Sequence, residues 1–239
     1  ALGSRGAALK RPYADYPGHF GAMVTPVEAI EKLAHRLAKT DFQMNTHAIG
    51  DSANAVVLNA YQKVLADKPG RRWRVEHAQI IDGLDIPSFS SDIIPSVQPT
   101  HATSDMYWAE KRLGSERMNG AYAYARLLKQ SGILALGTDF PVEQVNPFLT
   151  FYAATTRQDT SGWPEGGFLP DEALSRTETL WGMTRWAAYA MFREQEIGSI
   201  EVGKRADFCV LDQDIMEVRP QYIPQTKVLA TFVDGQKVY

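Results

Sequence analysis

Cysteine is almost absent from this 239-residue chain, which contains only Cys209. A single cysteine excludes an intrachain disulfide, and its position in an apolar run predicts a buried, unreactive thiol. The chain also lacks any apolar run close to the ~18 residues that a membrane-spanning helix needs. It has no basic cluster, and its formal net charge is −3. We therefore expect neither a membrane span nor a nucleic-acid partner.

Glycine-rich phosphate-binding motifs are missing as well. Neither Gly-x-Gly-x-x-Gly nor Gly-x₄-Gly-Lys-Ser/Thr occurs, which argues against a nucleotide-binding protein. The first ten residues contain no methionine and no apolar core of a secretory signal. We expect a piece of a longer protein that belongs in the cytoplasm, although a signal peptide on a preceding segment stays open.

Strand-like and helix-like segments alternate through most of the chain. We predict strands at residues 42–47, 72–77, 93–98 and 133–138. The last is apolar without alternation, as expected for a parallel strand that is buried on both faces. Four strand–helix repeats predict a parallel α/β sheet, either doubly wound or closed into a barrel.

The predicted helices include residues 117–130 and 175–191, and the second begins with a capping box formed by Ser175 and Glu178. Thr25 is expected to cap the first helix of the chain. The C-terminal end differs in character, because residues 207–212 and 228–234 have a β-rich composition. These two segments predict a small β appendage.

Side chains that can bind metals stand at the ends of all four predicted strands. His47 ends the first strand and His77 the second, while His101 follows the third and Asp139 the fourth. In barrels and in doubly wound sheets alike, the C-terminal strand ends form the functional edge. Each residue alone has a structural explanation, such as a turn cap for Asp139. Together, two imidazoles and a carboxylate suit Zn²⁺ or a similar metal.

Around these residues the chain resembles amidohydrolase family 3, which contains the N-substituted formamide deformylases, within the metal-dependent amidohydrolase superfamily. The matching segments are residues 2–9, 46–51, 75–79, 98–105, 137–142 and 198–207. The resemblance implies the C-terminal half of a (β/α)₈ TIM-type barrel, strands 5–8, over residues 1–195. It implies the C-terminal part of a small β-sandwich over residues 196–239.

The resemblance also implies roles for the strand-end residues. His47, His77 and Asp139 would be metal ligands, for one or two zinc ions in the intact enzyme. A water activated by the metal would attack the carbonyl of a non-peptide, amide-type carbon–nitrogen bond, with Asp139 as the proton shuttle. His101, Trp108 and Phe140 are expected to contact the substrate.

The chain also departs from the family pattern. It contains no His-x-His pair, and the family's bridging lysine would lie just before Ala1. It can supply at most three of the five or six expected ligands. The metal of the intact enzyme could therefore be absent from such a fragment. The alternatives are a catalytically inactive C-terminal fragment or scaffold, and a deaminase of the same superfamily. The expected partners are a small amide-type substrate and either the missing N-terminal half of the barrel or a second copy of this chain.

Overall fold

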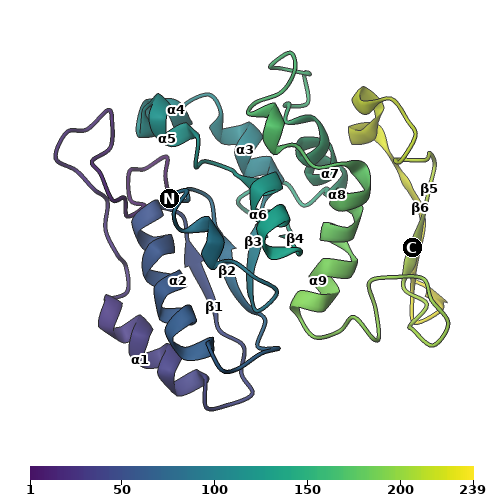
Figure 1. The fold of residues 1–239 in the computed structure, drawn as a ribbon. Helices are drawn as coiled ribbons and strands as arrows, with labels where there is room; N and C mark the ends of the chain where they lie inside the picture. The colour runs from purple at the N-terminus through teal and green to yellow at the C-terminus, as the bar shows by residue number, and fades with distance from the viewer. The chain divides into compact units, whose positions relative to one another are not determined.

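A computed structural model describes all 239 residues (Figure 1). They divide into two compact units. The first unit contains residues 1–97 and 104–134, and the second contains residues 98–103 and 135–239. None of the helices combines the length and the apolar character that crossing a membrane requires. The fold is mixed α/β with a parallel sheet, as the strand–helix alternation predicts.

The first unit is built on three parallel strands. Strand β1 (Asn45–Ala48) pairs with β2 (Trp73–His77), and β2 pairs with β3 (Ile93–Val97). The predicted order and direction of these strands are confirmed. The predicted start of the first strand is wrong, because Phe42 is 71% exposed and precedes the ladder.

Two helices, α1 (Val27–Leu37) and α2 (Asp51–Leu65), pack against each other, and α2 contacts β1 and β2. Tyr61 of α2 meets Trp73 of β2 edge-on, with ring centroids 4.9 Å apart and both side chains fully buried. Such an aromatic pair adds about 0.5–1.5 kcal/mol to the stabilisation from burial itself. The predicted cap at Thr25 is wrong, because Pro26 occupies the cap position and no side chain caps the helix.

The remaining helices of the first unit are short. They are η1 (Ile86–Ser88), α4 (Ala109–Leu113), α5 (Ser115–Met118) and α6 (Tyr124–Ser131), together with the last part of α3 (Pro99–Asp105). The prediction of one helix over residues 117–130 is wrong. The chain turns between Met118 and Tyr124, because Gly120 approaches the backbone of Ile81 so closely that a Cβ there would lie 1.9 Å from the carbonyl oxygen.

The second unit contains the fourth predicted strand, which is reduced to β4 (Ala135–Leu136) and contacts the helices α8 and α9. Its helical elements are α7 (Pro147–Thr156), η2 (Pro170–Glu172), α8 (Arg176–Met183) and α9 (Arg185–Ala190). The capping box of Ser175 and Glu178 is confirmed. The single helix predicted over residues 175–191 is wrong, because the backbone at Thr184 leaves the helical conformation.

The two β-rich segments at the C-terminal end form strands, as predicted. Strands β5 (Phe208–Leu211), β6 (Val228–Val233) and β7 (Gln236–Lys237) make an antiparallel sheet, and η3 (Pro220–Gln225) lies between β5 and β6. The prediction of a buried Cys209 is wrong: the thiol is exposed, because most of β5 is exposed in this small sheet.

The core of the second unit joins its C-terminal segment to a helix. Ile223 is fully buried against Phe148, Phe151 and Tyr152 of α7. Residues on either side of the predicted boundary at 195/196 therefore share one apolar cluster. The division into a half-barrel and part of a β-sandwich stays a prediction.

An ion cluster fixes the long loop at the start of the first unit. Arg5 Nη2 donates to Asp15 Oδ2 at 2.8 Å, Arg112 donates to the same carboxylate, and the Asp15 side chain is only 9% exposed. The hydrogen bond from Arg5, with the two guanidinium charges, holds the pKa of Asp15 below its ordinary value of 3.8.

We expect Asp15→Asn to lower the free energy of unfolding at neutral pH. Because the native-state pKa is depressed, the carboxylate's contribution is fully present above about pH 4 and is lost as the pH falls through the lowered pKa. Urea unfolding across this range should show the gap between the unaltered chain and the variant closing below about pH 4. A gap that is constant down to about pH 2 would contradict this account.

Candidate active site

Two of the predicted site residues, His47 and His77, lie side by side in the first unit. Their ring centroids are 4.4 Å apart, and the rings meet edge to face at 69°. His77 is buried, whereas His47 on β1 is exposed. The structure thus brings two imidazoles together at the ends of adjacent parallel strands.

The strand register alone does not explain this pairing. His47 is aligned with Glu76 and Ala48 with His77, so regular alternation would direct the two imidazoles to opposite faces of the sheet. His77 instead has a φ of +74°, and the next residue, Ala78, has a φ of +42°. Left-handed conformations are uncommon outside glycine. The alternation ends at this turn, and the turn brings His77 to His47.

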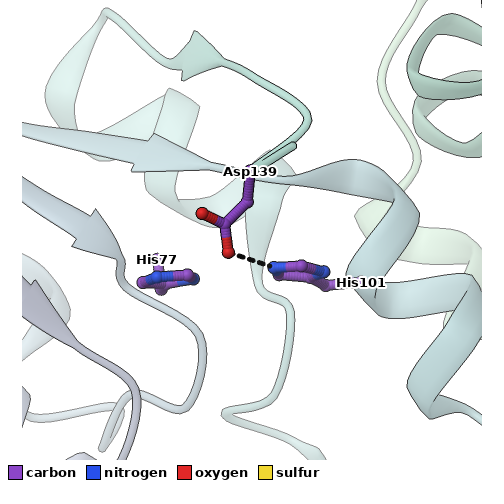
Figure 2. A group of neighbouring side chains, drawn as sticks. All are labelled: His77, His101 and Asp139. Carbon is purple, nitrogen blue, oxygen red and sulfur yellow. Dashed lines mark hydrogen bonds and ion pairs between the residues drawn. The ribbon is translucent and has the colours of Figure 1, made fainter. Parts of the chain in front are cut away.

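In the second unit, His101 lies between two carboxylates. Its Nε2 is 3.3 Å from Asp139 Oδ2, and this contact is the dashed line in Figure 2. Its Nδ1 is 3.0 Å from Glu143 Oε1. The side chain of His101 is 10% exposed and that of Glu143 19%, whereas that of Asp139 is 37% exposed. The two carboxylates fix the orientation of the ring. Asp139 has a φ of +57°, so it too stands in a left-handed turn just beyond a strand.

The predicted substrate contacts lie in different surroundings. Trp108 packs over Gly3, where an added Cβ would lie 3.2 Å from the indole, and Arg112 lies 5.8 Å from its ring centroid. Phe140 is 62% exposed beside Asp139 in the sequence. Glu143, which sequence reasoning missed, is 42 residues from the histidine that it orients. No spacing rule links two loop positions across such a distance.

The sequence profile of the amidohydrolase family matches residues 1–239. The chain belongs to the amidohydrolase family. The predicted resemblance to family 3 is confirmed by its relatives, which include an N-substituted formamide deformylase.

Three relatives show how far the similarity of this amidohydrolase-family chain extends. It is 35% identical to Protein LONG AFTER FAR-RED 3 from Arabidopsis thaliana, over 100% of this chain and 41% of that protein. It is 28% identical to the N-substituted formamide deformylase of Arthrobacter pascens, over 91% of this chain and 40% of the enzyme. A metal-dependent hydrolase structure from Pyrococcus horikoshii superposes with a TM-score of 0.81 and 30% identity, over 92% of this chain and 44% of that one.

This member of the amidohydrolase family therefore spans less than half the length of the relatives that it matches. Its site residues are of kinds that hold divalent metals: His77, His101 and Asp139 each offer an imidazole nitrogen or a carboxylate oxygen. Imidazole nitrogen combined with carboxylate oxygen is a donor set that suits zinc. The residues present thus fit a divalent metal ion, and the solved relative from Pyrococcus horikoshii is a metal-dependent hydrolase.

Proposed function

We propose that this chain is the C-terminal half of a metal-dependent hydrolase that cleaves non-peptide, amide-type carbon–nitrogen bonds. The observation that carries the proposal is the His47–His77 pair at the ends of adjacent parallel strands, in a chain that the amidohydrolase family matches throughout. A relative whose name specifies an N-substituted formamide supports an amide-type substrate.

We assign the metal, zinc by its donor types, to His47, His77 and Asp139. When bound, a zinc ion would polarise the substrate carbonyl and make a water molecule acidic enough to react at neutral pH. The chain's own contribution is to hold the ligands. Adjacent strands carry the two imidazoles, and the hydrogen bond from His101 at 3.3 Å orients the Asp139 carboxylate.

Asp139 would also move the proton. Its carboxylate accepts a proton from the water as the water oxygen bonds to the carbonyl carbon. It then returns that proton to the nitrogen as the carbon–nitrogen bond breaks, which leaves a carboxylic acid and an amine. Phe140 offers an exposed apolar contact for a substituent of the substrate, and His101 and Trp108 are the other proposed substrate contacts.

The complete site would require more polypeptide than this chain contains. Strand β1 is an edge strand, and a cavity of 610 Å³ lies beside it, lined by apolar residues of α1 and by β1 itself. Sheet edges readily accept another strand. Because the relatives are more than twice as long, we propose that an extended apolar segment of the N-terminal half occupies this cavity.

Zinc binding by the chain tests the assignment of the ligands. We expect the unaltered chain to take up Zn²⁺ in competition with a chromophoric chelator. His47→Gln and Asp139→Asn should each weaken that affinity by at least about 100-fold, since loss of a ligand costs more than the roughly 10–100-fold for a neighbour that supports one.

His35→Gln is the matched control, because His35 is an exposed histidine on α1. Its zinc affinity should equal that of the unaltered chain. Equal affinities in all the variants would contradict the ligand assignment. A chain that binds no zinc at all would favour the catalytically inactive fragment.

A further inference from the structure

A buried hydrogen-bond network lies directly beyond the His77 turn, within the first unit. Gln79 is 4% exposed, and its Nε2 donates to Asp105 Oδ2 at 2.8 Å and to the Tyr122 hydroxyl at 3.2 Å. The Tyr122 hydroxyl in turn donates to Asp105 Oδ2 at 2.7 Å. One carboxylate oxygen therefore accepts from two buried donors, and all three side chains are joined.

The backbone fixes the same segment. Tyr122 N donates to Gln79 O, and Ile81 N donates to Gly120 O, each at 2.8 Å, while Ile80 forms an antiparallel bridge with Ala121. The close approach at Gly120 leaves no space for a Cβ. Residues 79–81 are thus bound to the turn that interrupts the predicted helix.

The Tyr122 hydroxyl is suited to act as a permanent donor. Tyr122 is fully buried. Its burial, together with the Asp105 charge, raises the pKa of its phenol well above the ordinary value of 10.0. The hydroxyl therefore keeps its proton, and with it the ability to donate, across the neutral range.

Left-handed residues such as His77 and Ala78 cost free energy and persist only where their surroundings hold them. The network begins at the very next residue, Gln79. We propose that Asp105 and Tyr122 are positioning residues: acting through Gln79, they hold the left-handed turn that brings the His77 imidazole to His47. This inference rests on the proposed function, since it concerns the same two imidazoles.

The test uses Asp105→Asn and Tyr122→Phe, each of which removes one part of the network. Tyr13→Phe is the control, because Tyr13 is also buried and its hydroxyl donates to a backbone carbonyl, that of Ala7. The metal-free readout is the NMR spectrum of the imidazole C–H groups. The chain has five histidines, so His77→Gln and His47→Gln assign the two signals.

We expect both network variants to shift the His47 and His77 ring signals and to weaken the cross-peak between the rings. They should also speed amide exchange at residues 77–81, while Tyr13→Phe does neither. Zn²⁺ affinity should fall by roughly 10–100-fold in the two network variants alone, as for residues that orient a ligand.

Unchanged ring signals and exchange rates in both network variants would overturn the inference. So would equal changes in Tyr13→Phe, since these would indicate general destabilisation. Zinc uptake by the unaltered chain and turnover by the assembled hydrolase test the proposed function separately, because the ring signals and amide exchange are measured without metal.

Discussion

Asp139→Asn should lower kcat for amide hydrolysis by roughly 10²–10⁴-fold, the usual contribution of a positioned proton-transfer group. Asparagine keeps the shape of the side chain but cannot accept the proton of the attacking water. The variant should be assayed in the hydrolase assembled with its N-terminal half, and circular dichroism should show an unchanged fold.

Asp171→Asn provides the matched control, since Asp171 is an exposed carboxylate in η2. Its kcat should equal that of the unaltered enzyme. The substrate panel should contain N-substituted formamides and aminated heterocycles, because turnover of the second group alone would indicate a deaminase. Near-normal hydrolysis by Asp139→Asn would refute the role of Asp139 as proton shuttle.

The isolated chain should not sediment as a 26.6 kDa monomer. Its edge strand β1 and the apolar cavity beside it are expected to pair with another copy until the N-terminal half is added. Addition of that half should convert the self-associated chain into a one-to-one complex. Analytical ultracentrifugation measures both states.

A charged substitution in the cavity tests whether self-association uses this surface. Leu33 lines the cavity and is 39% exposed. Leu33→Asp should weaken association by about 10-fold or more, because burying a leucine is worth roughly 1.5–3 kcal/mol. Leu84→Asp, at an 87% exposed position outside the cavity, should leave association unchanged. A monodisperse monomer that unfolds cooperatively would contradict both expectations.

The sequence predicted the strand order of the first unit and the residues at the strand ends. Strand periodicity is a local property, and β2 and β3 begin and end within one residue of their predicted bounds. The broken helix after Met118 was not predictable in this way. Its cause is a contact with Ile81, about 40 residues away along the chain, and local periodicity carries no information about such contacts.

The residues of the candidate site likewise differ in whether the sequence could predict them. The residues His47, His77, His101 and Asp139 could be chosen because each ends or follows a strand that the sequence predicts. Glu143, Asp105 and Tyr122 could not, because their importance comes from hydrogen bonds to residues 17 to 43 positions away. The left-handed conformation of His77 could not be predicted from the sequence either, since such conformations are uncommon outside glycine.

The exposed Cys209 has a practical consequence. Because it is the only cysteine and lies on β5, a maleimide dye or nitroxide would attach at a single place in the second unit. Two labelled copies in one particle would then give a spin–spin distance distribution, which would show whether self-association has one geometry or many. The same thiol could cross-link copies by air oxidation, so sedimentation runs need a reductant to keep covalent dimers from being mistaken for strand pairing.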